Sequence, residues 1–289
     1  MVHYRFFSRR LKKTLEGISA SNLAVIGVMI IGIFAIIAIF ASILAPYDPY
    51  DIDLMSTYQP PSSQHLFGTD NVGRDIFSRI LYGSRLAFVI TLLVVIIELS
   101  ISVPLALISS YRGGYFDEIV MRIMDVIISI PSLMRAIVIV ALLGPNMRNA
   151  ILAIGIGYMP MLARLVRSVA LSIKEGPYIE ACRVLRFSAK RIAFSHILPN
   201  IVPVIIVQVS LDLGYALVDM ASLSFIGLGV QPPKASWGAM LAVGKDYLLN
   251  SPWMCIFPGI AIALLVLGFN LFGIGLGKIL NPRYQRQLK

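Results

Sequence analysis

The sequence predicts an all-α integral membrane protein with six transmembrane helices, and three observations support this prediction. The 289 residues are 57% hydrophobic and only 14% charged, with a mean hydropathy of +0.81, whereas soluble domains carry about 25% charged residues. Six apolar runs are each long enough to cross about 30 Å of hydrocarbon as a helix. The basic residues, which give a net charge of +10, gather in alternate connections between these runs.

The first span follows a basic N-terminal segment, residues 1–22. The uncharged run from Leu23 to Ala45 is longer than the core of a signal peptide, which has roughly 7 to 15 apolar residues. We therefore expect a retained transmembrane helix over residues 23–45.

Five further apolar runs predict the remaining spans. The fourth is the least regular, because its charge-free part ends at Ala163 and contains Pro160. We expect this helix to continue through Arg164 and Arg167 into water. The five predicted spans are Leu86–Ser110, Ile119–Leu143, Ala150–Leu171, Ile201–Ile226 and Trp253–Ile279.

The distribution of Lys and Arg predicts that both termini are cytoplasmic. With the N-terminus inside, most of the 25 basic residues fall on the cytoplasmic side, where such residues are retained. The net charge is therefore a topology signal, and nucleic-acid binding is not expected.

The connections give the domain organisation. Residues 46–85 form an outer loop that ends in an amphipathic stretch, and residues 86–279 form a core domain with five spans. This core includes a cytoplasmic loop, 172–200, and an outer hairpin, 227–252, and is followed by a cytoplasmic tail, 280–289.

Catalytic and cofactor motifs are absent from the sequence. The three histidines, His3, His65 and His196, lie outside the predicted spans, and the two cysteines, Cys182 and Cys255, form no CxxC pair. There is no HExxH, GxSxG, GxxxxGK[ST] or GxGxxG motif. We therefore expect no enzymatic activity, no metal site and no cofactor on this chain.

The last predicted span contains a GxxxG spacing from Gly273 to Gly277. Such glycines let membrane helices approach closely, so we interpret them as packing residues.

The cytoplasmic loop has the pattern of two short helices. Pro177 suits a first helical turn, and Glu180 in that turn faces the favourable end of the helix dipole. A bend is expected near residues 186–188. Apolar residues interleave with arginines, a pattern that fits either a groove on a water-soluble partner or the lipid surface.

Several motifs resemble bacterial ABC importer permeases. Glu180-Ala181-Cys182 followed by residues 196–200 resembles the EAA loop, which docks on the ATP-hydrolysing subunit. Residues 65–79 resemble the signature loop of the dipeptide, oligopeptide and nickel permeases, specifically the second permease of the pair. Further similar motifs are residues 121–125, 224–233, 237–238 and 257–259, and the resemblance covers about residues 20–283.

The resemblance implies a type I ABC importer permease fold with ATP and Mg²⁺ bound by partner subunits. The partners would be a homologous permease in a heterodimer, two ATP-binding subunits and an extracytoplasmic substrate-binding protein, at the bacterial cytoplasmic membrane. The residues expected to couple to the ATPase are Glu180, Ala181, Cys182, Arg183, Arg186, Phe187, His196, Leu198 and Pro199.

The chain departs from the family pattern at three positions. Arg186 stands where the EAA loop normally has glycine, and glycine takes backbone conformations that arginine takes only at a cost. Cys182 replaces alanine. Arg135 replaces an apolar residue in the third span.

Charged residues inside the spans are candidates for the translocation path, because burying a charge in a membrane is costly. They are Arg135, Glu98, Asp212 and Asp219. Arg135 has two interpretations: an ion pair with one of these carboxylates, or a contact to a substrate carboxylate, in which case Arg135→Leu impairs uptake but not assembly. Arg122 and Asp125 are expected to form a structural ion pair.

The predicted function is import of small peptides. Within the same importer class, nickel or a metal chelate such as an opine or metallophore is the alternative substrate. A passive channel and an intramembrane enzyme are more distant alternatives, and the enzyme would need nucleophile and base residues that the spans lack.

Overall fold

The computed structural model describes residues 21–280, and the regular secondary structure of this part is helical, apart from one isolated bridge between Thr69 and Asp75. Most of the two predicted cytoplasmic segments, 1–22 and 280–289, lies outside the described residues. Five helices in the described part are long and apolar enough to cross a membrane, or six if one bent pair counts as a single span. The predicted all-α membrane fold is confirmed.

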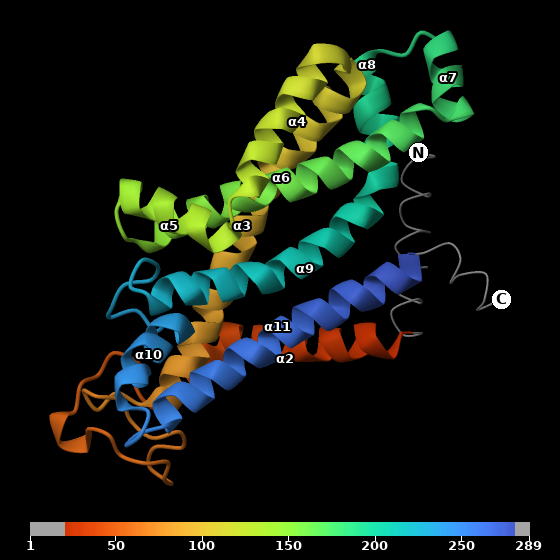
Figure 1. The fold of residues 1–289 in the computed structure, drawn as a ribbon. Coiled ribbons are helices and arrows are strands. Elements are labelled where there is room, and N and C mark those ends of the chain that lie inside the picture. The colour runs from red at the N-terminus through yellow and green to blue at the C-terminus, as the bar shows by residue number, and fades with distance from the viewer. Residues whose placement is uncertain (1–20, 281–289) are drawn as a thin grey trace.

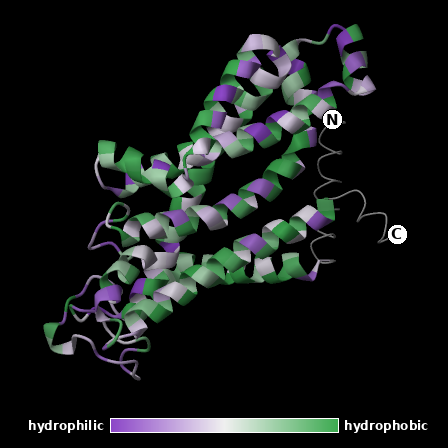
Figure 2. Cartoon of the chain, viewed as in Figure 1, coloured by the Kyte–Doolittle hydropathy of each residue, from purple (hydrophilic) through white to green (hydrophobic). Residues whose placement is uncertain are grey.

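The five long helices form one bundle. Helices α2, α11, α9 and α6 lie side by side in that order, and α3 crosses them (Figure 1). Apolar residues dominate α2 and α11, whereas polar residues gather in the segment that follows α2 (Figure 2). The bounds are α2 Asn22–Leu44, α3 Ile76–Arg112, α6 Met147–Lys174, α9 Leu198–Phe225 and α11 Trp253–Leu280.

Helix α3 begins at Ile76 rather than at the predicted Leu86, so the amphipathic stretch of the outer loop is its first turns. The cause is a side-chain cap, in which Oδ2 of Asp75 accepts a hydrogen bond from the amide of Ser78 at 2.7 Å. An aspartate at this position satisfies one of the free amide groups of the first turn.

The third predicted span is broken, and the expectation of one continuous helix was wrong. Helix α4, Gly114–Ser129, and helix α5, Ser132–Leu143, meet at an angle of 93°. Ile130 is extended, with φ −94° and ψ 130°, and Pro131 follows it. Proline donates no backbone hydrogen bond and disfavours a helical conformation at the preceding residue, which accounts for the break.

Helix α6 confirms the expected continuation through Arg164 and Arg167. It contains Pro160 and ends at Lys174. Its C-terminal half packs against the C-terminal part of α3 and against α4, while residues 150–154 pack in a second cluster with α5 and α9.

Glycines of α11 allow two close helix contacts. A Cβ atom at Gly275 would lie 2.5 Å from the amide of Ala24 in α2, and one at Gly273 would lie 2.9 Å from Leu211 in α9. The interpretation of the GxxxG spacing as a packing feature is confirmed for Gly273, whereas a Cβ atom at Gly277 would lie 3.4 Å from Val207, an ordinary contact.

Candidate functional site

The predicted coupling loop forms a separate element at one end of the bundle, far from α10 (Trp237–Gly244) at the other end (Figure 1). Helix α7, Pro177–Val184, is followed by a turn, by the short helix α8, Ala189–Arg191, and by a π-helical segment η2, Ile192–Ile197, which enters α9. Ile179, Cys182 and Ile192 are buried in a core shared with α6. The two short elements and the bend predicted near residues 186–188 are confirmed.

The turn after α7 has the geometry of a Schellman motif. The amide of Phe187 donates to the carbonyl of Cys182 at 3.1 Å, and the amide of Arg186 donates to Arg183 at 2.9 Å. Arg186 has φ +55°, the left-handed conformation that this motif requires and that glycine adopts most easily. This conformation is a physical reason for the glycine that the resemblance implies at this position, and arginine occupies it with backbone strain.

A set of side-chain contacts joins the parts of this loop. The hydroxyl of Tyr178 lies 2.7 Å from Nδ1 of His196, and the ring of Phe187 stacks on the His196 imidazole with centroids 5.6 Å apart. The guanidinium of Arg191 lies over the Phe187 ring at 4.1 Å. The contacts connect α7, the turn and η2 into one unit.

The nine predicted coupling residues divide by exposure. Cys182 is buried, so its side chain contributes to the core of the loop and not to its surface. Phe187, His196 and Leu198 are half-buried. The exposed members are Glu180, Ala181, Arg183, Arg186 and Pro199.

Basic residues of α6 hold the end of α3 and the start of α4. Asp117 of α4 accepts a hydrogen bond from Nε of Arg167 at 2.6 Å and a second one from its Nη2. Nζ of Lys174 donates to the carbonyls of Ser110 and Tyr111, near the end of α3, at 2.7 and 3.1 Å.

The expected ion pair between Arg122 and Asp125 was wrong. Asp125 instead forms an ion pair with Arg164 of α6. Residues three apart can meet on one helix, but the C-terminal extension of α6 brings a competing arginine beside α4. The feature of the sequence that could have predicted this contact is the continuation of α6 into its basic stretch.

Arg135 lies at the bend between α4 and α5. Its Nη1 donates to the carbonyl of Ile127, in the last turn of α4, and its Nη2 donates to the carbonyl of Gly157 in α6 at 3.0 Å. The expected ion pair of Arg135 with Glu98, Asp212 or Asp219 is not formed within the described residues, although Asp219 interacts with it electrostatically. The helix break supplies a free carbonyl, and the guanidinium occupies it.

The three carboxyl groups predicted for the path, those of Asp219, Asp212 and Glu98, lie in the bundle and have polar neighbours of their own. The hydroxyl of Tyr158 in α6 donates to Oδ2 of Asp219 at 2.8 Å. Nε2 of Gln208 donates to both oxygens of Asp212 at 3.0 and 3.2 Å. Glu98 of α3 interacts with Asp212.

The structure therefore brings all four predicted path residues into one polar cluster. Sequence reasoning missed Tyr158 and Gln208, although Gln208 precedes Asp212 by four positions and so shares its helical face.

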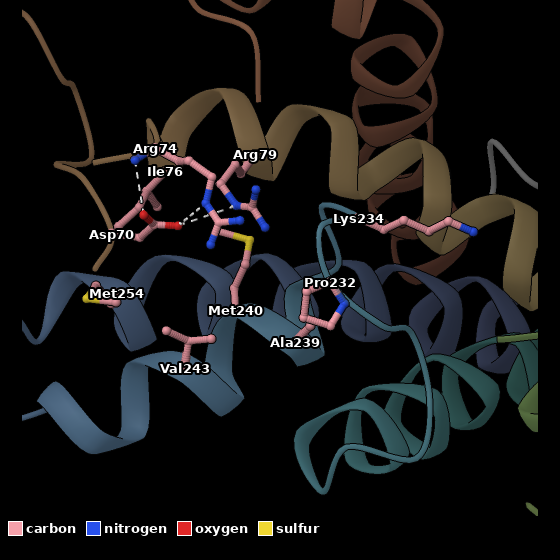
Figure 3. A pocket seen from close by; sticks show the side chains of 10 residues that line it. All are labelled: Asp70, Arg74, Ile76, Arg79, Pro232, Lys234, Ala239, Met240, Val243 and Met254. Carbon is pink, nitrogen blue, oxygen red and sulfur yellow. Dashed lines mark hydrogen bonds and ion pairs between the residues drawn. The ribbon is translucent and has the colours of Figure 1, made fainter. Parts of the chain in front are cut away.

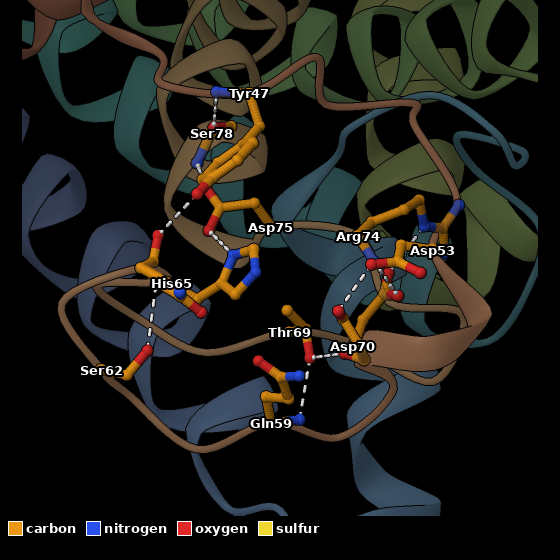
Figure 4. A network of polar contacts seen from close by, with 12 residues as sticks. Tyr47, Asp53, Gln59, Ser62, His65, Thr69, Asp70, Arg74, Asp75 and Ser78 are labelled. Atoms are coloured by element: carbon orange, nitrogen blue, oxygen red, sulfur yellow. Dashed lines mark hydrogen bonds and ion pairs between the residues drawn. The ribbon is translucent and has the colours of Figure 1, made fainter.

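The segment between α2 and α3 is ordered by its polar residues (Figure 4). Oδ1 of Asp70 accepts hydrogen bonds from the amides of Val72 and Arg74, each at 3.0 Å, and Nδ1 of His65 lies 3.0 Å from Asp75. Gly73 has φ +80°, and a Cβ atom there would lie 1.8 Å from the carbonyl of Asp53. The signature loop thus needs glycine at this position.

Asp53 begins a short 3-10 turn in the same segment. Hydrogen bonds from the hydroxyl of Ser56 and from the amide of Met55 hold the pKa of this carboxyl below its usual value. The turn therefore keeps its charged cap at neutral pH.

A small cavity of about 30 Å³ lies between this segment and α10 (Figure 3). Asp70, Arg74 and Arg79 line one side, and Pro232 and Met240 belong to the opposite side. Nε1 of Trp237 donates to the carbonyl of Ile80 at 3.1 Å, and Nη1 of Arg79 donates to Pro49 at 2.7 Å. The two predicted outer connections form one layer.

Comparison with protein families gives two matches. Residues 102–286 match the family described as binding-protein-dependent transport system inner membrane component. Residues 14–61 match the N-terminal transmembrane domain of oligopeptide transport permease C.

Individual relatives align over most of their length. The probable D,D-dipeptide transport system permease protein DdpC of Escherichia coli (strain K12) is 45% identical, and the alignment covers 96% of this chain and 93% of DdpC. The dipeptide transport system permease protein DppC of Alkalihalophilus pseudofirmus is 41% identical over 94% and 90%. The glutathione transport system permease protein GsiD of Pectobacterium atrosepticum is 40% identical over 97% and 91%.

The fold is similar to a chain of the MetNI methionine ABC transporter, solved in inward-facing conformations. The TM-score is 0.58 at 18% identity, and the match covers 71% of this chain and 98% of that one. At this identity the likeness concerns the fold, and the family follows from the sequence matches above. The chain belongs to the family of binding-protein-dependent transport system inner membrane components.

Proposed function

We propose that this chain is the membrane-spanning permease subunit of an ATP-driven importer that carries short peptides across the bacterial cytoplasmic membrane. The observation that carries the proposal is the exposed helix α7, held on a buried base of Ile179 and Cys182 beyond the end of the spanning bundle. The relatives described above are named for dipeptide, D,D-dipeptide and glutathione transport, which favours a peptide substrate. None of these names supports the nickel or metal-chelate alternative.

The chain would act without chemistry of its own. ATP and Mg²⁺ would bind two partner ATPases, which contact the exposed residues Glu180, Ala181, Arg183, Arg186 and Pro199. An extracytoplasmic binding protein would deliver substrate to the outer layer formed by residues 45–75 and α10. A homologous permease would complete the path as a heterodimer, and both termini of this chain would be cytoplasmic.

The proposed mechanism uses the side-chain contacts that connect α7 to the segment entering α9. When the ATPases close, α7 moves with them, and the contacts of Tyr178, Phe187 and His196 pass this motion to η2. Helix α9 continues from η2 and carries Asp212 and Asp219. Rigid-body movement of this kind can turn a central path from one side of the membrane to the other.

The path would be lined by the polar cluster around Arg135 and Asp219, both of which are half-buried. A peptide carries a carboxylate and an ammonium group at neutral pH, and these are the partners of a guanidinium and a carboxylate. Glu98 and Asp212 are buried and would form the part of the cluster farthest from the substrate.

Co-purification combined with transport tests the proposal. A tagged chain, extracted gently from its native membrane, should bring a second permease and ATPase subunits, and proteoliposomes of that complex should import labelled dipeptide when ATP is supplied. Glu180→Lys should release the ATPases or uncouple ATP hydrolysis from transport, whereas Glu118→Lys, at an exposed position of α4, should not. Recovery of the chain alone, or full coupling in Glu180→Lys, would contradict the proposal.

A further inference from the structure

Glu98 is the most deeply buried acidic residue of the described helices, with 1% of its surface exposed. It lies in the interior of α3, beside Asp212 of α9, which is 7% exposed. Two carboxylates side by side in an apolar interior repel each other and lose their hydration, so they are not both ionised without a compensating ligand.

Neither carboxyl oxygen of Glu98 has a hydrogen-bond partner within the described part of the chain. Three donors around the pair form hydrogen bonds with other acceptors. Gln208 donates to Asp212, Tyr158 donates to Asp219, and Ser102, one turn beyond Glu98, donates to the carbonyl of Met159 at 3.0 Å. Two ionised carboxyl groups can only accept hydrogen bonds, so the pair has acceptors on both sides and no donor between them.

We propose that Glu98 and Asp212 form a proton-binding site inside the helix bundle, in which Glu98 carries the proton and donates its O–H to Asp212. The proton removes the repulsion, satisfies one orphan oxygen and connects α3 to α9. Gln208 stabilises the remaining charge on Asp212 by donating to both of its oxygens. The site rests on the burial of both carboxyl groups, on the two unpartnered oxygens of Glu98 and on the hydrogen bonds of Gln208 to Asp212, and it is independent of the proposed transport function.

The groups that face the pair from the neighbouring helices fit this assignment. They are Tyr158 on α6, Asp219 on α9 and, beyond Asp219, Arg135 on α5. Helix α2 carries no titratable residue, and those of α11, Cys255 and Lys278, lie near its two ends. The guanidinium of Arg135 donates to two backbone carbonyls. It therefore does not form an ion pair with Glu98 or Asp212 that would neutralise their charge in place of a proton.

A metal ion fits the site less well than a proton does. A cation in a protein requires several oxygen ligands, and the described residues contain no cluster of three or more histidine, cysteine, aspartate or glutamate side chains that could hold one. The pair offers only two carboxyl groups, and one of them, that of Asp212, also accepts hydrogen bonds from Gln208.

Infrared spectroscopy of the purified complex in lipid nanodiscs at neutral pH tests the proposal, because a protonated carboxyl group has a carbonyl band separate from that of carboxylates. We expect a band that shifts in D₂O and is lost in Glu98→Gln, whose amide can still donate to Asp212. The matched control is Glu118→Gln, at an exposed glutamate, which should leave the band intact. An unchanged band in Glu98→Gln would overturn the proposal.

Two further measurements keep the test decisive. If Glu98→Gln does not assemble, Asp212→Asn should retain the band at a shifted position, because the acceptor of the Glu98 proton changes; an unchanged or absent band there would contradict the site. Thermal unfolding should be the same in sodium and choline chloride. Stabilisation by sodium alone would assign the site to a metal cation and overturn the proton assignment.

Discussion

The hydroxyl of Tyr178 and Nδ1 of His196 lie 2.7 Å apart, and this hydrogen bond joins α7 to the segment that enters α9. The two residues are 18 positions apart, and Phe187 from the intervening turn stacks on the same imidazole. The exposed helix therefore has a polar connection to the bundle in addition to its buried apolar base.

We expect Tyr178→Phe to weaken coupling. The variant keeps the ring but loses a hydrogen bond worth about 1 kcal/mol, which corresponds to about a fivefold shift in a local equilibrium. The measurement is the number of peptides transported per ATP hydrolysed in proteoliposomes. Tyr115→Phe, at a tyrosine of α4 that is 86% exposed, is the matched control and should behave as wild type. Equal coupling in the two variants would show that the hydrogen bond plays no part.

Arg186 gives a second prediction, about the turn itself. Arg186→Gly should be tolerated, because glycine adopts φ +55° without the penalty of about 1 to 2 kcal/mol that other residues have there. The greater conformational entropy of glycine in the unfolded chain offsets part of this gain. Arg186→Val should destabilise the loop, because a β-branched residue rarely takes a positive φ.

Arg183→Val, at an exposed helical position of α7, removes the same charge without a positive φ and is the control. ATPase binding to the purified permease would be measured for all three variants. Equal loss in Arg183→Val and Arg186→Val would point to charge rather than to backbone geometry.

The sequence predicted the features that depend on hydrophobicity and local chain preferences. The ends of α2 and α11 lie within a residue or so of the predicted spans, and the two-part coupling loop followed from Pro177 and the expected bend at residues 186–188. The break at Pro131 was missed because the run from Ile119 to Leu143 is apolar throughout, and apolar length does not distinguish a straight helix from a broken one.

The partners of charged residues could not be predicted in the same way. Asp125 could meet Arg122 on its own helix or a residue of another helix, and only the packing of α4 against α6 selects Arg164. Arg135 was expected beside a carboxylate, but its ligands are backbone carbonyls, one of them freed by the helix break that the sequence did not reveal.

Gly73 in the outer segment should not tolerate a side chain. Gly73→Ala places a Cβ against the Asp53 carbonyl at a residue with φ +80°, and we expect a loss of about 1 to 3 kcal/mol of stability. Gly32→Ala in α2, where an added Cβ meets nothing within 4 Å, is the control. Protease sensitivity of the outer segment in intact complexes would show the difference, and equal sensitivity would contradict the tight contact.

The two ion pairs between α4 and α6 should differ in energy. Asp117→Asn disrupts a bidentate pair with half-buried Arg167 and should cost about 2 kcal/mol, whereas Asp125→Asn affects an exposed pair and should cost about 0 to 1 kcal/mol. Double-mutant cycles with Arg167→Gln and Arg164→Gln, measured by thermal unfolding in detergent, separate each pair from its surroundings. A larger coupling energy for Asp125 would contradict this ranking.

Substitutions of Arg135 distinguish a role in stability from a role in substrate binding. Arg135→Leu leaves the Ile127 carbonyl without its donor at the bend between α4 and α5, which should cost about 1 to 3 kcal/mol of stability as well as transport. Arg135→Lys keeps the charge but cannot reach two carbonyls with one planar group, so we expect an intermediate loss. Transport and thermal unfolding should be measured on the same preparations. A transport defect with unchanged unfolding would assign Arg135 to substrate binding alone, whereas unchanged transport in Arg135→Leu would exclude that contact.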